Sequence, residues 1–377
     1  MSGVAVARLS HPLAWTRPLA AARHEIMTET AWGHPRIINL GPDVMAVGGI
    51  ETVIRTYIRV LSPFASVLAI PTWRPGARAC GLRAAVSAGM KLVSSQPLLA
   101  EASIVHVHLS HRGSFCREGL LIALAKALGY RVFATVHGSD YVATSSHFPW
   151  RLIYTAVTRR ADAVAVLNEE AMVATRRMAP STHVQVLPNP GPVPDNWVPA
   201  TKPGAADRKV LFAGAVGKRK GIDVLLSAWD TVTAEVDSVE LLLAGPIEDM
   251  VIPPHPTVKV LGPLSHEQVR ELLGRVRVAV LPSRAEGMPM FVLEAMAAGR
   301  PVVGTTVGAM PEMLHGTGRL VATEDVRGLA EALKCYLVDP ALADRDGTAG
   351  REEYLNGHSE SAVVQQLAQF YRVGDPI

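Results

Sequence analysis

Two acidic residues, Glu286 and Glu294, stand eight positions apart in an otherwise apolar segment. The segment from Ser283 to Thr305 reads SRAEGMPMFVLEAMAAGRPVVGT, so a loop that carries Glu286 leads from a strand into a helix that carries Glu294. An ionised carboxylate accepts two hydroxyl donors at once, which suits a polyol ligand. Exposed glutamates are the norm, but a carboxylate flanked by Phe-Val-Leu and Ala-Met-Ala is normally paired or engaged in binding. We therefore expect this pair to bind a sugar.

Backbone amides add hydrogen-bond donors beside the two carboxylates. The expected helix runs from about residue 291 to 298, and the start of a helix leaves N–H groups without partners, here around Met288, Met290 and Phe291. The helix dipole places a partial positive charge at the same end. Carboxylates and amides together suit a sugar that carries a phosphate.

A second loop combines glycines with three adjacent cations. Residues 212–221 read FAGAVGKRKG, follow an expected strand and open an expected helix. Glycine lets the backbone approach a phosphate, and the cations neutralise the phosphate without a metal ion. We expect Lys220, helped by Arg219 or Lys218, to hold a diphosphate, with a solvated charged turn as the alternative. The glycines are not spaced as Gly-x-Gly-x-x-Gly, which argues against a nicotinamide dinucleotide.

The first half of the chain offers two further candidate sites at the ends of expected strands. Gly48 and Gly49 precede a helix, where bare amides can meet a phosphate, although a tight turn alone also explains a Gly-Gly pair. His137 ends another strand, where it can touch either substrate near the reacting centre, although a lone histidine is more often structural.

A metal site is not expected. His106, His108 and His111 lack a cysteine or carboxylate at ligand spacing, and Asp344 and Asp346 share an Asp-x-Asp spacing that we attribute to chance, because it falls in a polar helical region after the last strand.

Composition limits the class of protein. The chain has 377 residues, 49% of them hydrophobic, which is enough for two domains. A net charge of +3 and 5% aromatic residues argue against a nucleic-acid groove. Three scattered cysteines, Cys80, Cys116 and Cys335, fit a reducing, cytoplasmic location, and no apolar run reaches the roughly 18 residues of a spanning helix. Association with the inner face of a membrane is kept as an alternative.

Strand and helix patterns alternate along most of the chain. Residues 1–35 are an N-terminal extension that we expect to be poorly ordered. Short β-branched runs separated by helical stretches then fill residues 36–190 and again 191–358, across a Pro- and Gly-rich linker over 188–207, and residues 359–377 form a last helix that packs back on the first domain. The expected fold is α/β, with two Rossmann-like domains whose parallel sheets face each other across a cleft.

With these residues in place, the chain resembles glycosyltransferase family 4, the retaining enzymes of the GT-B fold, over residues 36–377. The strongest likeness is the Glu-x7-Glu motif of Glu286 and Glu294. The resemblance implies that Glu286 contacts the hydroxyls of the transferred sugar and Glu294 the nucleotide ribose, and that His137, Lys220 and Glu286 form the catalytic set. It also implies donor binding by Gly48, Gly49, Arg219, Lys220, Gly262, Glu286, Gly287, Met288, Met290, Phe291 and Glu294.

The chain departs from the family pattern at three places, and one stretch resembles a particular group of members. Ala215 stands where many members have an arginine, so Arg219 or Lys218 is expected to supply the second cation. Gly308-Ala309 replaces a frequent Gly-Gly, and Pro190-Gly191 replaces the common Gly-Val after Pro-Asn. The stretch His108–Ser114 is similar to members that build bacterial capsular or exopolysaccharide repeats.

The resemblance implies a retaining transfer of a sugar from a nucleoside-diphosphate sugar, UDP- or GDP-linked, to an acceptor hydroxyl. A lipid-linked or oligosaccharide acceptor in polysaccharide or glycoconjugate synthesis is expected, and no cofactor, metal or nucleic acid is. The alternatives are glycosylation of a small natural product, epimerisation or phosphorolysis of a sugar nucleotide on the same fold, and a non-catalytic sugar-nucleotide-binding protein.

Overall fold

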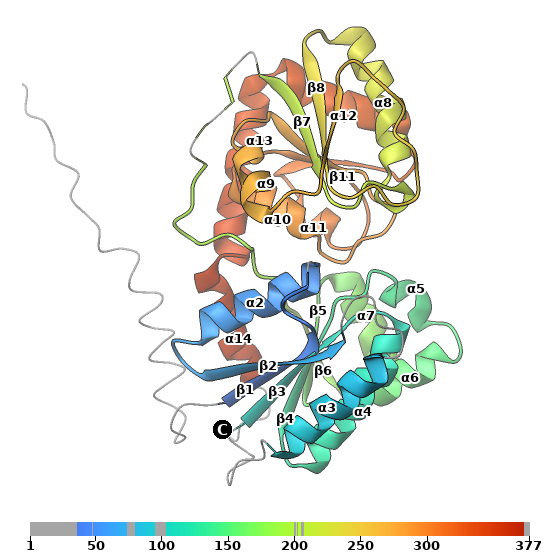
Figure 1. The fold of residues 1–377 in the computed structure, drawn as a ribbon, viewed down its shortest axis with the longest axis vertical. Coiled ribbons are helices and arrows are strands. Elements are labelled where there is room, and N and C mark those ends of the chain that lie inside the picture. Colours follow the sequence, from blue (N-terminus) through green and yellow to red (C-terminus); the bar gives the residue numbers. More distant parts are fainter. Residues whose placement is uncertain are drawn as a thin grey trace, which may run out of the picture.

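The computed structural model of the protein describes residues 36–46, 48–73, 80–94, 103–199, 201, 203–204 and 207–372. The N-terminal extension predicted over residues 1–35 lies outside the described residues. The described chain folds into two α/β domains, which lie one above the other in Figure 1.

The first domain is built on a six-stranded parallel sheet with the strand order β2-β1-β3-β4-β5-β6. Its strands are β1 (Arg36–Pro42), β2 (Ser66–Trp73), β3 (Ser103–Leu109), β4 (Arg131–Val136), β5 (Ala163–Val166) and β6 (His183–Val186). Its helices are α2 (Gly49–Leu61), α3 (Cys80–Ser94), α4 (Arg112–Ala127), α5 (Tyr141–Ser145), α6 (Trp150–Thr158) and α7 (Glu169–Met178).

The second domain repeats the plan with the order β12-β11-β10-β7-β8-β9. Its strands are β7 (Arg208–Ala213), β8 (Val239–Ala244), β9 (Val258–Gly262), β10 (Val278–Leu281), β11 (Val302–Thr305) and β12 (Gly318–Val321). Its helices are the 3-10 helix η2 (Lys218–Lys220), α8 (Ile222–Glu235), α9 (His266–Leu273), α10 (Met290–Ala297), α11 (Met310–Met313), α12 (Val326–Val338) and α13 (Pro340–Gly357). The predicted pair of parallel sheets is confirmed.

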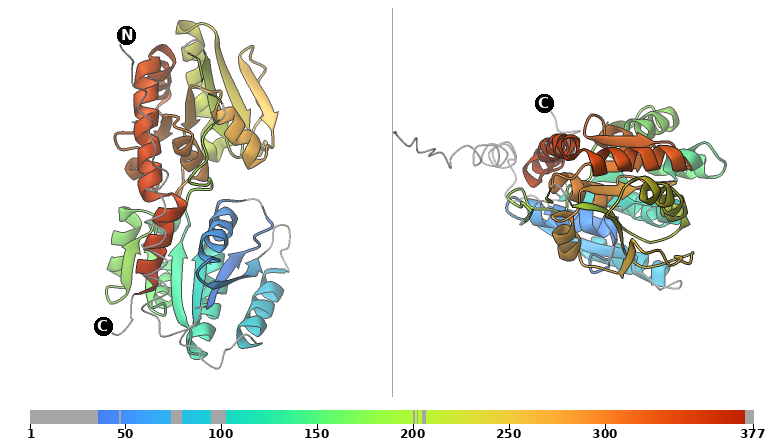
Figure 2. Two further views of the ribbon diagram at one scale, coloured as in Figure 1. Left: turned by 90° about the vertical axis from the view of Figure 1, so that its left-hand side faces the viewer. Right: turned by 90° about the horizontal axis from the view of Figure 1, so that it is seen from above.

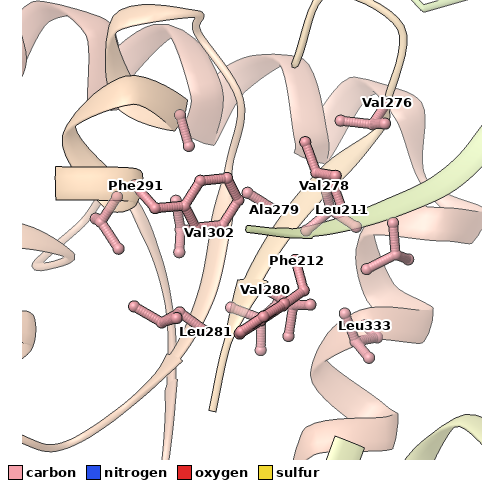
Figure 3. Close-up of a cluster of buried hydrophobic side chains, with 14 of the residues drawn as sticks. Leu211, Phe212, Val276, Val278, Ala279, Val280, Leu281, Phe291, Val302 and Leu333 are labelled. Atoms are coloured by element: carbon pink, nitrogen blue, oxygen red, sulfur yellow. The ribbon is translucent and has the colours of Figure 1, made fainter. Parts of the chain in front are cut away.

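Continuous apolar runs mark the central strands because these strands are covered on both faces. All four residues of β10 are buried, as are those of β5 and β11. Figure 3 shows the side chains of β7 and β10 between Phe291 of α10 and Leu333 of α12. The same expectation is wrong for β9, whose middle residues are exposed, because β9 is the edge strand of its sheet.

The chain crosses between the domains twice. After α13, the last helix α14 (Glu360–Tyr371) lies along the first domain (Figure 2) and buries Val363, Val364, Leu367 and Phe370 against it. The linker runs beside the junction of α13 and α14, where Asp195 accepts a hydrogen bond from the Glu360 amide at 2.6 Å and Gly191 donates one to the His358 carbonyl at 2.7 Å. These bonds tie the two crossings into one hinge.

We predict that Leu367→Ala destabilises the first domain by about 2–5 kcal/mol, because Leu367 is fully buried between α14 and the sheet and its removal leaves a cavity. Leu152→Ala is the matched control. Leu152 lies on helix α6 and is 61% exposed, so its replacement should change stability by no more than about 0.5 kcal/mol. Urea unfolding followed by circular dichroism measures both. Equal midpoints for the two variants would show that α14 does not stabilise the first domain.

Candidate functional site

A cleft of about 1060 Å³ opens between the two domains. Its walls come from the carboxyl ends of both sheets, since lining residues follow strand after strand: Ser110 after β3, His137 after β4, Leu167 after β5, Asn189 after β6, Gly214 after β7, Gly245 after β8, Pro263 after β9 and Glu286 after β10. Ligands of parallel α/β sheets bind at this edge. The volume is at the upper end of the range for sites that bind small molecules.

Glu286 and Lys220 form an ion pair in the wall of the second domain. Lys220 Nζ donates to Glu286 Oε1 at 2.5 Å, and the two side chains are only 14% and 8% exposed. Their loops approach this closely because Gly221, which follows Lys220, has a left-handed backbone (φ 71°) and packs against the carbonyl of Pro282, where a Cβ would overlap that oxygen. The ammonium has two further protons available for a ligand.

Arg284 holds the backbone of the loop that carries Lys218, Arg219 and Lys220, here called the cation loop. Its guanidinium forms a bidentate pair with Asp223 at 2.8 and 2.9 Å and also binds Glu324, and both acids raise the pKa of the arginine. The same side chain donates to the carbonyl of Lys218, and the Arg284 amide donates to that of Arg219 at 2.9 Å. Arg219 lines the cleft, whereas Lys218 is not among the lining residues that the structure describes. Geometry therefore favours Arg219 over Lys218 as the companion of Lys220.

Glu294 lies inside α10 and is paired with a residue of another helix. Its side chain is 4% exposed, and His266 Nδ1 approaches Glu294 Oε1 to 2.7 Å. The pKa of His266 is raised, mainly by this hydrogen bond, against the opposing effects of partial burial and of the cations Arg55 and Arg270. His266 and Glu294 are thus paired at the edge of the cleft.

Two helix starts face each other across the cleft. Helix α2 begins after Gly48 and α10 after Pro289, neither with a side-chain cap, so their first amides are available to a ligand. A Cβ on Gly49 would lie 3.6 Å from Met290 Cγ, and Figure 1 shows α2 below α10 and α11. Glu51, buried in the first turn of α2, lies over Gly48 and also lines the cleft.

His137 belongs to a buried chain of histidines. Its Nε2 lies 3.0 Å from Nδ1 of His108, whose Nε2 lies 3.2 Å from Oδ1 of Asn39. His106 stacks on His108 with ring centroids 4.6 Å apart, and its two ring nitrogens lie 2.7 Å from the hydroxyls of Tyr371 and Thr135. Burial lowers the pKa of His137 to about 4 despite the nearby Asn189 amide, so the ring is neutral at pH 7.

The cleft brings together all but one of the predicted site residues. Gly48, Gly49, His137, Arg219, Lys220, Glu286, Gly287, Met288, Met290, Phe291 and Glu294 all line it. Gly262 ends β9 with a left-handed backbone (φ 70°) and is not among the described lining residues, although its neighbour Pro263 is. Gly287 allows its loop to approach the first domain closely, because a Cβ at this position would lie 2.7 Å from the His137 carbonyl oxygen.

The lining residues that sequence reasoning did not single out include His266, Glu51 and Asn189. His266 follows a capping serine directly after a strand-to-helix loop, which is the signal that could have found it. Asn189 donates to the Met288 carbonyl at 3.2 Å and so joins the linker to the Glu286 loop. The Asp344-x-Asp346 spacing lies in α13, where Asp346 accepts a hydrogen bond from Tyr336. The described residues contain no group of three or more side chains that could hold a metal ion.

Comparison with known proteins finds likenesses to sugar-transferring enzymes. Residues 207–339 match the family model "Glycosyl transferases group 1". Glycogen synthase of Mycobacterium tuberculosis is 29% identical over 273 residues, which are 66% of this chain and 65% of that protein, so the chain spans slightly under two thirds of this relative.

Solved structures share the fold. Sucrose-phosphate synthase from Thermosynechococcus elongatus superimposes with a TM-score of 0.69 at 20% identity, covering 90% of this chain and 98% of that one. Anabaena Alr3699/HepE, solved in complex with UDP-glucose, gives a TM-score of 0.68 at 15% identity, covering 90% and 99%. The two-domain arrangement is therefore the GT-B fold.

We predict that the stability of the protein falls as the pH is lowered below 6.5, and that the histidine chain is one cause. Burial lowers the pKa of His106 to about 3 and that of His137 to about 4, whereas an unfolded histidine titrates near 6.5. The unfolded state then binds more protons, so each buried histidine costs up to about 1.4 kcal/mol of unfolding free energy per pH unit below 6.5.

Urea unfolding at pH 7, 6 and 5 should therefore show a shallower pH slope for His106→Gln than for the wild type. His183→Gln replaces an exposed histidine and should leave the slope unchanged. A slope in His106→Gln equal to that of the wild type would contradict the assignment.

Proposed function

We propose that the chain, which has the GT-B fold and resembles glycosyltransferase family 4, moves a sugar from a nucleoside-diphosphate sugar to an acceptor hydroxyl with retention of anomeric configuration. The observation that carries the proposal is the Lys220–Glu286 pair in the wall of an interdomain cleft. One member of this pair suits a diphosphate and the other suits sugar hydroxyls.

In this proposal the donor lies against the second domain. Lys220 donates one hydrogen bond to Glu286 and its other hydrogen bonds to the diphosphate, and Arg219 lies beside it. The amides at the starts of α2 and α10 donate to the same phosphates from two sides. Glu286 accepts hydrogen bonds from hydroxyls of the transferred sugar, and Glu294 accepts them from the ribose.

The transfer step breaks the bond between the anomeric carbon and the phosphate oxygen and forms a bond from that carbon to the acceptor oxygen. Negative charge grows on the departing diphosphate, so fixed cations and amides aimed at it lower the barrier. The acceptor's proton passes to the leaving diphosphate, which acts as the base on the face that the acceptor attacks. His137 is neutral at pH 7, so its proposed part is a hydrogen bond near the reacting centre rather than that of a charged acid.

The acceptor is proposed to enter from the first domain. Its class is a lipid-linked sugar or an oligosaccharide, in line with the sequence likeness around His108–Ser114. We propose a cytoplasmic site of action. Within the described residues, no helix combines the length and the apolar character needed to cross a membrane.

We predict that Glu286→Gln and Lys220→Ala each reduce turnover by a factor of about 10² or more, because each removes a contact to a group whose charge changes in the transition state. Lys126→Ala, which breaks a surface pair with Asp162, is the control and should retain full activity. Donors are first selected by a thermal-shift screen of nucleotide sugars, and release of nucleoside diphosphate is then followed with a panel of glycan acceptors. Wild-type rates in both cleft variants would remove the basis of the proposal.

We further predict that turnover is retained in EDTA, since Lys220, Arg219 and the helix amides occupy the role that a divalent ion plays for a leaving diphosphate. The measurement is nucleoside diphosphate release with and without EDTA, and then with Mn²⁺ added back. Loss of activity in EDTA with recovery in Mn²⁺ would show that a metal ion takes part.

A further inference from the structure

The side chain of His266 is fixed at the rim of the cleft by the way its helix begins. Ser265 caps α9 in a capping box, in which its hydroxyl accepts from the Gln268 amide at 3.2 Å and Gln268 Oε1 accepts from the Ser265 amide at 2.9 Å. His266 is the first residue of that helix, and its side chain is 45% exposed in a lining position. Its backbone therefore has little freedom, and its ring faces α10.

Glu294 needs the partner that His266 supplies. The carboxylate is 4% exposed and is flanked along α10 by the buried residues Leu293 and Ala295. An ionised group in such surroundings requires a compensating donor or charge. Within the described part of the chain, the side-chain partner of Glu294 is His266, through Oε1 at 2.7 Å.

The pairing with His266 engages one carboxylate oxygen of Glu294, Oε1, and leaves Oε2 available to a ligand. No hydrogen bond among the described residues engages Oε2 of Glu294, and the side chain lines the cleft. A carboxylate oxygen accepts two hydrogen bonds, which matches two neighbouring hydroxyls on one ring. The nucleotide ribose carries such a pair, and a deoxyribose does not.

We propose that His266 is a positioning residue that makes the donor site selective for ribonucleotides. By holding Oε1, it fixes the orientation of Glu294 so that Oε2 meets the 2′- and 3′-hydroxyls of the ribose. This inference rests on the proposed function, in which Glu294 faces the ribose. Without the imidazole, Oε1 loses its partner and the carboxylate is free to turn, so the distinction between ribose and deoxyribose falls.

The test is a set of dissociation constants from isothermal titration calorimetry for UDP, GDP, their 2′-deoxy counterparts and inorganic pyrophosphate. In the wild type, the ribonucleotide should bind about tenfold or more tightly than the deoxyribonucleotide, as expected for a hydrogen bond to a charged group. In His266→Ala the ratio should fall towards one, while pyrophosphate affinity stays unchanged. His266→Gln, which retains an N–H donor, should restore part of the ratio.

Two further single variants and one double variant test whether His266 acts through Glu294. Glu267→Ala changes the exposed neighbour on the same helix turn, which is not among the described lining residues, and should keep the wild-type ratio. Glu294→Gln should lose the ratio by itself, and adding His266→Ala to it should lower the ratio no further, because the histidine acts through the carboxylate.

The outcomes separate the inference from the function beneath it. If the wild type binds neither nucleotides nor pyrophosphate, the proposed function fails. If the wild type binds nucleotides but His266→Ala keeps the ribose preference, or if the wild type has no such preference, the inference fails alone. Equal weakening of every ligand, pyrophosphate included, would show a merely structural histidine and would also overturn it.

Discussion

A buried carboxylate must meet a cation or a hydrogen-bond donor, and this constraint organises the second-domain wall of the cleft. Glu286 and Glu294 come from one strand-loop-helix unit, yet each is held by a basic side chain from a different element, Lys220 from η2 and His266 from α9. The arrangement of its two acids therefore depends on η2 and α9, which lie beside it. The chemistry of the wall depends on the order of strands in the sheet.

The loop of Lys218, Arg219 and Lys220 is held in place by contacts to its backbone. Arg284 holds the backbone of the loop from the far side, and Gly221 allows the close approach to Pro282. The position of the ammonium therefore depends on the backbone of this loop and on the ion pair with Glu286.

The domains meet through a few small residues and a double crossing. Gly287 lies against the His137 carbonyl, Gly49 against Met290, and Asn189 binds the Met288 carbonyl. Near them, Asp195 and His358 join the linker to the start of α14. The loops of the second-domain wall therefore touch the first domain and the linker at once.

Local patterns were enough to predict the two parallel sheets, the cleft and several residues at its walls. β-branched runs identify strands buried on both faces, and a glycine, acid or cation placed directly after such a run lies at the carboxyl edge of its sheet. Glu286, Lys220, Gly48 and His137 could be found in this way because the strand before each one determines its position.

The partners of those residues could not be found by the same means. Lys220 and Glu286 are 66 positions apart, and His266 and Glu294 are 28 apart, so no local pattern links them. The exposure of β9 depended on its place at the sheet edge, and the neutral state of His137 depended on burial among His106, His108 and Asn39. The sequence by itself determined which residue types stand at the ends of which strands, because that information is local. Only the tertiary structure decided which of them are paired, buried or left open to a ligand, because pairing and desolvation arise from contacts between distant segments.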